Sequence, residues 1–398
     1  MARPDSLIVV ALLTELVALG PISTDLYLPS LPSLVSVFDA DVASVQLTLS
    51  VFLAGFAVGQ LVYGPLSDRF GRKPVMLAGL VIYLAASLLC ALAGSIEALI
   101  AARFVQALGA CVGPVLGRAV VRDVFGQARA ATVLSYMGVA MALAPALGPI
   151  LGGYLEIWFG WRSSFLALFA FALIGLAGVI ALLPETNVWR DSRATGAAGL
   201  AANYRALLAS RRYKGFLLVF ASAYAGIFAF ISGSSFVLID TLKLAPNLYG
   251  LSFGAIVAGY MAGTLASGRL TERLGIERMV QVGIGFALAG SLTGVACAAA
   301  GLLSLAAVLA PVFVFMVGTG FMLPNAMAGA IGPFSRMAGT ASSLLGFVQM
   351  ILAAVVGVAV GRTTAETALP MSLAIAAMAL LALAAYAGLV RRAPLPAE

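Results

Sequence analysis

The sequence predicts an all-α membrane protein in which twelve helices form two related six-helix bundles. Its composition, its apolar runs and a repeated loop motif support this prediction. Hydrophobic residues make up 62% of the 398 and charged residues only 10%, with a mean hydropathy of +1.07. A soluble domain is closer to half apolar and a quarter charged. We therefore expect a bilayer to cover most of the surface.

Apolar runs of membrane-spanning length, about 20 residues, recur along the whole chain. They lack the alternating pattern of barrel strands, so helices are the predicted spanning structures. The first run contains Glu15 and Asp25 and is longer than the core of a signal peptide, so we interpret it as a retained helix. The twelve expected helices cover residues 6–28, 44–63, 75–93, 98–121, 132–154, 163–183, 215–238, 249–267, 279–300, 303–329, 337–360 and 370–390.

The basic residues separate between the two sides of the predicted membrane. With both termini on one side, that side receives 18 of the 23 Lys and Arg residues, and the other side receives Arg162, Lys243 and Arg362. Arg103 and Arg118 remain inside the fourth run. The positive-inside rule makes the richer side cytoplasmic. The net charge of +7 therefore indicates topology and does not indicate nucleic-acid binding.

A repeated motif indicates two halves. A polar break divides the chain into a bundle at 1–183, a cytoplasmic linker at 184–214 and a bundle at 215–398. Gly64–Gly71 (GPLSDRFG) follows the second run, and Gly268–Gly275 (GRLTERLG) follows the eighth, 204 residues later. An internal repeat is typical of secondary transporters.

Several motifs resemble those of the major facilitator superfamily. Gly64–Lys73 (GPLSDRFGRK) resembles its loop 2–3 signature, and Arg103–Gly109 (RFVQALG) resembles its helix 4 motif. Ala144–Gly153 (APALGPILGG) resembles the helix 5 motif of its drug/proton antiporters, with Ala144 where Gly is usual. The bicyclomycin/chloramphenicol-resistance branch is indicated by three further segments, Ser23–Pro32, Arg118–Asp123 and Ala338–Ser343.

This resemblance implies the major facilitator fold, in which a pseudo-twofold axis relates the bundles and helices 1, 4, 7 and 10 line a central cavity. It implies a proton-coupled multidrug or antibiotic efflux antiporter that works by alternating access. The expected location is the bacterial inner membrane, with both termini cytoplasmic. The expected partners are a drug-like small molecule, protons and lipid, without nucleic acid, cofactor or metal, and we expect a monomer.

Few groups in the chain can carry the proton. It has no histidine, and only Glu15 and Asp25 lie clearly within a predicted span. A charge in hydrocarbon usually faces a cavity or a partner. Arg103 lies at a depth similar to that of Asp25, so we predict that the two form a charge pair that protonation of Asp25 releases. Glu15 is the second candidate, and Arg118 is expected to face the interior.

The loop motif and the helix 5 motif predict the moving parts. Glycines permit a tight turn, and Asp68, expected at the start of the third helix, would pair with a nearby guanidinium. Such a cluster can lock the cytoplasmic helix ends in the outward-facing state. In helix 5, prolines bend the helix and glycines permit close contact. The predicted gating residues are Gly64, Asp68, Arg69, Gly71, Arg72, Pro145, Gly148, Pro149, Gly152, Glu272 and Arg273.

A drug cavity should be lined by large, adaptable apolar side chains and a few polar ones. Asn325 is the strongest single candidate, because an amide in hydrocarbon needs a partner. The predicted substrate-binding residues are Tyr27, Gln46, Tyr136, Tyr224, Phe228, Phe236, Met316, Asn325 and Gln349.

Other function classes have less support. Gly250–Gly254 (GLSFG) matches a nucleophile-elbow pattern, but a chain without histidine cannot form a Ser–His pair. The three cysteines have no paired spacing for a disulfide or a metal. A primary pump would need a phosphate-binding loop, and the sequence has none. Nothing in it resembles the repeated filter of a channel. The main alternative is a proton-coupled uptake symporter for a small metabolite. The helix 5 motif favours antiport over that alternative.

Overall fold

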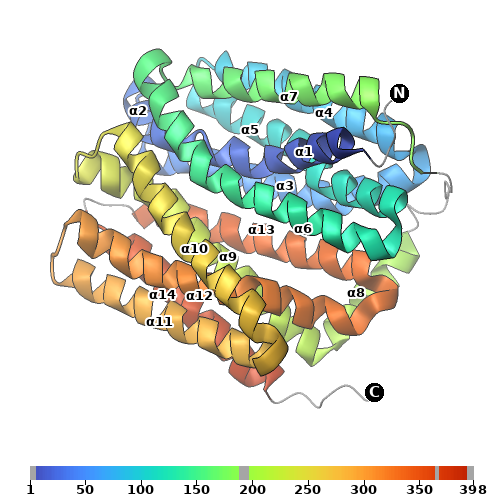
Figure 1. Cartoon of the computed structure of the whole chain (residues 1–398). Helices are drawn as coiled ribbons and strands as arrows, with labels where there is room; N and C mark the ends of the chain where they lie inside the picture. Colours follow the sequence, from blue (N-terminus) through green and yellow to red (C-terminus); the bar gives the residue numbers. More distant parts are fainter. Residues whose placement is uncertain (1–5, 188–196, 364–366, 392–398) are drawn as a thin grey trace. The chain divides into compact units, whose positions relative to one another are not determined.

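The computed structural model describes residues 6–187, 197–363 and 367–391, apart from the side chains of 126–132, 134–136, 138–143, 197–202 and 335–336. Every regular element within these residues is a helix (Figure 1). Eleven helical stretches among them are long and apolar enough to cross a membrane. They coincide with eleven of the twelve predicted runs. The remaining run, 132–154, includes side chains outside the described set. The prediction of an all-α, multi-pass membrane protein is confirmed.

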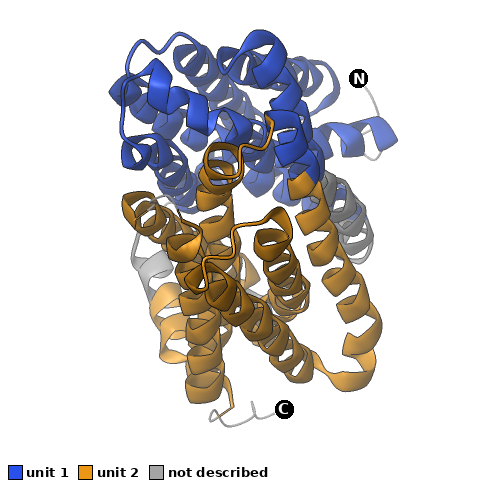
Figure 2. Ribbon diagram, turned by 90° about the vertical axis from the view of Figure 1, so that its left-hand side faces the viewer, with its two compact units in different colours: residues 1–196, 246–251 blue, residues 197–245, 252–398 orange. Residues whose placement is uncertain are grey.

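The chain forms two compact units, shown in different colours in Figure 2. Unit 1 comprises residues 1–196 and 246–251, and unit 2 comprises residues 197–245 and 252–398. Unit 1 contains α1 (Leu7–Asp25), η1 (Leu28–Ser30), α2 (Leu31–Val37), α3 (Val42–Phe70), α4 (Arg72–Ala91), α5 (Ile96–Ala110), α6 (Val112–Phe159) and α7 (Arg162–Leu182). Unit 2 contains α8 (Ala197–Ala209), α9 (Arg211–Ser235), η2 (Phe236–Thr241), most of α10 (Pro246–Leu274), α11 (Ile276–Ala299), α12 (Leu305–Ile331), η3 (Gly332–Met337), α13 (Ala338–Thr363), α14 (Leu369–Ala385) and η4 (Tyr386–Val390).

Each unit has its own core. In unit 1, α1 packs against α6 and α7, while α5 packs against α3 and α4. In unit 2, α9 contacts α12, α13 and α14, and α11 packs against α12 and α14. Helices α1 and α9, the first membrane spans of the two halves, are therefore each contacted by several other helices. These contacts explain why α9 is buried along nearly its whole length.

The backbone repeats where the sequence does. Helices α3 and α10 both have 29 residues, and they begin at Val42 and Pro246, the same offset that separates the motifs. Each ends at a glycine with positive φ, 103° at Gly71 and 80° at Gly275. A side chain is strained in that conformation, so both turns need glycine, as the sequence predicts.

Helix α1 stops at Asp25, short of the predicted end at residue 28. An α-helix bonds each amide to the carbonyl four residues earlier, and Pro29 has no amide hydrogen for the carbonyl of Asp25. The chain continues as η1 and then α2. The motif Ser23–Pro32 therefore forms a break in the first membrane span, and Asp25 lies at the edge of that break.

Helix α6 is continuous over 48 residues. Its beginning and its end nevertheless pass α1 in opposite directions. Along the backbone of the first span, Gly113 approaches the carbonyl of Leu16, and Gly117, which lies against the Val17 side chain, approaches that of Leu13; Gly148 and Gly152 instead approach Asp25 and then Leu26, in ascending order. Two stretches that pass the same helix in opposite directions are antiparallel. Helix α6 therefore supplies the end of the predicted span at 98–121 and also the predicted span at 132–154.

The predicted linker contains an additional helix. Helix α8 lies within the expected polar break, and it packs against α9 and α13. Its sequence is rich in Ala and Leu, the strongest helix formers, and Leu207 is fully buried. The predicted linker at 184–214 therefore includes a helix that packs on unit 2.

Candidate functional site

Arg103 lies at the centre of a buried aromatic cluster in unit 1. Its side chain is 0% exposed. The centre of its guanidinium lies 4.2 Å from the ring centroid of Phe52, 5.1 Å from that of Tyr27 and 5.8 Å from that of Phe165. Aromatic faces attract a cation within about 6 Å. Three rings from α3, the α1 break and α7 therefore stabilise a charge that sits away from water.

Hydrogen bonds fix the orientation of this guanidinium. Arg103 Nη1 donates to Gln106 Oε1 at 2.6 Å and to the carbonyl oxygen of Ser23 at 3.0 Å. Gln106 Nε2 donates in turn to Ser87 Oγ at 2.9 Å, and the Ser23 hydroxyl bonds to that of Tyr83 at 2.6 Å. Among the described residues, Arg103 Nε and Nη2 have no hydrogen-bond partner. The arginine therefore retains two free donors in this conformation.

Asp25 is buried at the last turn of α1, with 3% of its surface exposed. Its Oδ1 accepts a hydrogen bond from Thr24 Oγ1 at 3.2 Å. The predicted charge pair with Arg103 is not formed, since the ion pairs among the described residues do not include either side chain. The reason is geometric: Arg103 reaches α1 on the side of Ser23, whereas Asp25 faces α6.

The glycines of the helix 5 motif create the surface that Asp25 contacts. A Cβ on Gly148 would lie 2.9 Å from Asp25 Cβ, and a Cβ on Gly152 would overlap the carbonyl oxygen of Leu26. Pro145 and Pro149 lie on the same stretch, inside the helix. This part of α6 therefore approaches the break in α1 at backbone distance, as small residues permit between membrane helices.

Glu15 lies on α1 ten residues before Asp25, and its half-buried side chain faces α7. A Cβ on Gly175 would lie 3.2 Å from Glu15 Oε1, and this oxygen has no hydrogen-bond partner among the described residues. Glu15 and Asp25 therefore face different helices. The structure does not bring the two predicted proton carriers together.

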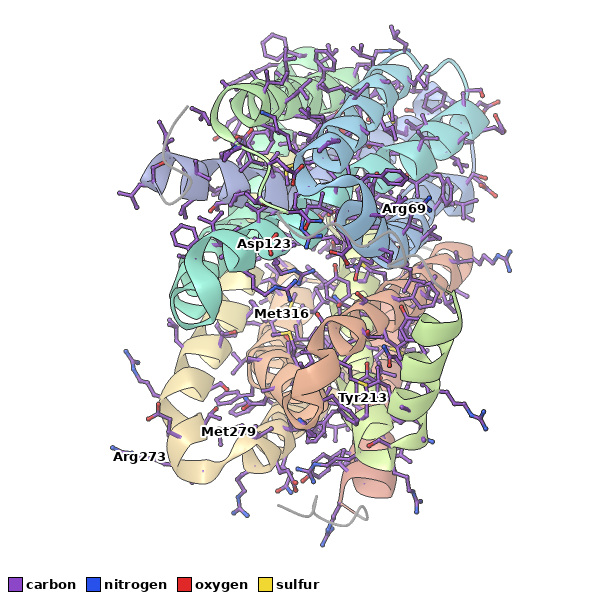
Figure 3. The ribbon with its side chains drawn as sticks, turned by 90° about the vertical axis from the view of Figure 1, so that its right-hand side faces the viewer. Arg69, Asp123, Tyr213, Arg273, Met279 and Met316 are labelled. Atoms are coloured by element: carbon purple, nitrogen blue, oxygen red, sulfur yellow. The ribbon has the colours of Figure 1, made fainter. Side chains whose placement is uncertain are left out.

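The loop motif forms an ionic cluster at one end of unit 1, the face that Figure 3 shows with Arg69 and Asp123 labelled. Arg72 Nη1 lies 2.5 Å from Asp68 Oδ1 and 2.6 Å from Ser67 Oγ, and Arg72 Nε lies 3.0 Å from Asp123 Oδ2. Asp68 belongs to the last turn of α3, so its expected place at the start of the next helix is wrong. A carboxylate at a helix C-terminus is unfavourable, and Arg72 compensates it. Arg69 is exposed, with its guanidinium 5.1 Å from the ring centroid of Phe70.

In the equivalent turn of unit 2, neutral groups hold the end of α10, while Glu277 at the start of α11 pairs with Arg212. Glu272 and Arg273 are exposed there. Asn325 Nδ2 donates to Ser267 Oγ at 2.6 Å, and Thr271 Oγ1 donates to Asn325 Oδ1 at 3.1 Å. Asn325 therefore finds the partner that an amide in hydrocarbon needs, and it connects α12 to the end of α10.

The remaining substrate candidates differ in exposure. The buried ones are Tyr27, Gln46, Phe228, Phe236 and Met316. Tyr224 and Gln349 are half-buried, and Tyr136 lies in α6 with its side chain outside the described residues. A hollow in unit 2 is lined by side chains of α11, α12 and α14, among them Ser291, Pro311 and Ser372. None of the predicted substrate residues lines it.

Sequence reasoning missed several members of these clusters. Asp123 was part of a recognised motif without a role, and its acidic side chain beside Arg122 was the available signal. Gln106 lies one turn after Arg103 on the same helix face, so helical spacing could have found it.

Arg118 is exposed within an apolar span, and its Nε donates to the carbonyl oxygen of Pro114 at 2.7 Å.

Comparisons with known proteins agree with this arrangement. The pattern described as Major Facilitator Superfamily matches residues 16–358. A bicyclomycin resistance protein homolog of Haemophilus influenzae is 30% identical over 376 residues, which cover 94% of each chain. Multidrug resistance protein D of Escherichia coli is 30% identical over 355 residues, 88% of each chain. A partially occluded, inward-open structure of the xylose transporter of Escherichia coli has the same fold, with a TM-score of 0.75, 16% identity and coverage of 99% of this chain and 100% of that one.

Proposed function

The chain belongs to the major facilitator superfamily, and on that premise we propose that it is a proton-coupled antiporter that exports drugs or antibiotics by alternating access. The relatives named for bicyclomycin and multidrug resistance support export. The observation that carries the proposal is the carboxylate of Asp25, buried at the break in α1 against the helix 5 glycines. An ionisable group inside a membrane span is a functional candidate by default.

In this proposal Asp25 carries the proton, Glu15 is the second carrier, and Arg103 is a fixed positive charge nearby. The free donors of Arg103 are available to Asp25 in another conformation, so the predicted pair becomes a feature of a different state. A ligand or proton can shift such an equilibrium only through its different affinity for the two states. Exchange follows if deprotonated Asp25 favours drug binding and protonated Asp25 favours release.

The loop cluster serves as a gate. Arg72 holds Asp68 at the end of α3 and Asp123 on α6, so the pairs connect three helices at one end of unit 1. Breaking them frees these helix ends to move. The glycine-rich contact between α1 and α6 is the proposed hinge. The exposed Glu272 and Arg273 complete the gate in the second half.

Tyr224 and Gln349 are the first substrate side chains to test, since both are half-buried and so retain some exposed surface. The buried candidates need a conformational change before a drug can touch them. Asn325 ranks lower, because Ser267 and Thr271 already bind its amide. Arg118 adds a cation that suits neutral or acidic drugs with oxygen acceptors.

We further propose a monomer in the bacterial inner membrane, with both termini cytoplasmic and no cofactor. The basic residues support this orientation. The two bundles, joined at 184–214, would act as the moving bodies.

Flux direction tests the proposal. In inside-out vesicles energised by respiration, the full chain should accumulate chloramphenicol, bicyclomycin or ethidium, and each probe should dissipate the proton gradient. Vesicles without the protein give the background. Movement of a probe in the same direction as the proton would establish the alternative, an uptake symporter.

A further inference from the structure

The turn between α3 and α4 has no capping side chain of its own. Only Gly71 separates the two helices; its amide donates to the carbonyl oxygen of Ser67 at the end of α3, but it has no side chain to bind the free amides at the start of α4. A helix leaves its first amides and its last carbonyls without partners inside the helix. The turn therefore needs partners from elsewhere, and a segment more than 100 residues later in the chain provides them.

Glu185, just after α7, accepts hydrogen bonds from the start of α4. The amide of Arg72 donates to Glu185 Oε1 at 2.9 Å, and the amide of Lys73 donates to Glu185 Oε2 at 3.2 Å. A carboxylate at a helix N-terminus satisfies free amides and is favoured by the helix dipole. Lys73 Nζ also donates to the carbonyl oxygen of Ile180 on α7, at 3.0 Å.

Asn187 completes the same function at the end of α3. Its Nδ2 donates to the carbonyl oxygens of Ser67 at 3.1 Å and Asp68 at 3.0 Å. Its own amide donates to Glu185 Oε1 at 2.8 Å. The two residues therefore bind each other and both helix ends, with carboxylate on the amides and amide on the carbonyls.

The side chain that depends most on this turn is Arg72, which is 6% exposed. Its backbone amide is bound by Glu185 while its guanidinium binds Asp68 and Asp123. In unit 2, the corresponding helix start is connected to α9 by a different contact, between Glu277 and Arg212 at 2.6 Å. Within the described residues, the two turns are therefore connected to the rest of their units by different contacts.

We propose that Glu185 and Asn187 are positioning residues that hold Arg72 in the gate, so that the linker begins as part of the gate. This proposal rests on the gating role proposed above. Loss of the contacts of Glu185 and Asn187 would release the turn, and the turn would release the pairs of Arg72 with Asp68 and Asp123.

Amide hydrogen exchange in the purified full chain tests the clamp without any substrate. Glu185→Gln places an amide group against backbone amides, and Asn187→Asp places carboxylate oxygens against two carbonyls. Both should speed exchange in the peptide containing Arg72 and Lys73 by about tenfold. Asn187→Ala is the milder variant if Asn187→Asp fails to fold. The matched control is Thr186→Val, because the Thr186 hydroxyl has no partner among the described residues. Equal exchange in Glu185→Gln and wild type would overturn the proposal.

Transport separates positioning from mere support of the fold. With chloramphenicol in inside-out vesicles, Glu185→Gln should lower the maximal rate by about tenfold and leave the half-saturating concentration unchanged. Combined with Asp68→Ala, it should add no further loss, because both act on one cluster. Additive losses, or full transport in Glu185→Gln, would refute the positioning role. If wild type transports no probe, the proposed export function fails, while hydrogen exchange still decides whether the clamp holds the turn.

Discussion

At the scale of single residues, Asp25 and Arg103 make different contacts at the last turn of α1. Arg103 binds the carbonyl of Ser23, and Asp25 lies against Gly148 of α6. A fixed cation and a titratable carboxylate therefore share one helix end without neutralising each other. Protonation of Asp25 can alter the contact between α1 and α6 while Arg103 keeps its place among the aromatic rings.

Asp25→Asn should abolish uphill efflux while binding of a neutral drug survives, because the amide resembles the protonated acid but releases no proton. A proton-transfer group contributes on the order of a hundredfold or more to a coupled step. The measurement is drug-induced proton release from detergent-solubilised protein. Glu15→Gln should be milder. Undiminished release in Asp25→Asn, with loss in Glu15→Gln, would transfer the principal role to Glu15.

Arg103→Lys should destabilise unit 1, although the charge is retained. A lysine ammonium is a compact point charge, and it cannot preserve the planar contacts with Phe52 and Tyr27 together with the bond to Gln106. Loss of one charged hydrogen bond costs about 1.5–3 kcal/mol. Thermal unfolding in detergent should show a lower midpoint than wild type. A midpoint and an efflux rate equal to those of wild type would show that the aromatic cluster adds nothing.

At the scale of elements, α6 and the break in α1 meet at backbone distance. Gly152→Ala would place a methyl group on the Leu26 carbonyl, and overpacking typically costs about 1–3 kcal/mol. We expect lower thermal stability and slower efflux. Gly285→Ala on α11 is the control, because nothing lies within 4 Å of an added Cβ there. Equal behaviour of the two variants would argue against a constrained hinge.

The gate gives a second prediction at this scale. Asp68→Ala leaves Asp123 as the only carboxylate bound by Arg72 and removes the ion pair between α3 and α4, so efflux should fall severalfold while expression remains largely intact. The carboxyl of Asp68 is partly exposed, so little stability should be lost. Expression is read from the purified yield, and efflux from the initial rate in vesicles. Full transport in Asp68→Ala would show that the loop only connects α3 to α4 and has no gating role.

Sequence reasoning identified the helices well, because apolar length and turn glycines act locally. It could not find which way Asp25 and Arg103 point, since a shared depth leaves helix rotation undetermined. It placed Asp68 on the wrong helix, because α3 continues past its apolar run to Phe70. It also assigned Asn325 to a cavity, although its partners Ser267 and Thr271 come from α10, far away in the chain. Such pairings depend on tertiary contacts.

At the scale of the whole molecule, topology follows from charge, and it can be tested with introduced cysteines. Lys243, Arg362 and Arg273 are all exposed, so each can be replaced by Cys in a background that lacks the native thiols. The positive-inside rule places Lys243 and Arg362 outside and Arg273 in the cytoplasm. An impermeant thiol reagent should label Lys243→Cys and Arg362→Cys in intact cells, and Arg273→Cys only after permeabilisation. Removal of the native thiols breaks no cross-link, because Cys90, Cys111 and Cys297 are all free. Labelling of Arg273→Cys in intact cells would show that the orientation in the membrane is the opposite of the one proposed. It would also contradict the proposed cytoplasmic gate and the proposed direction of export.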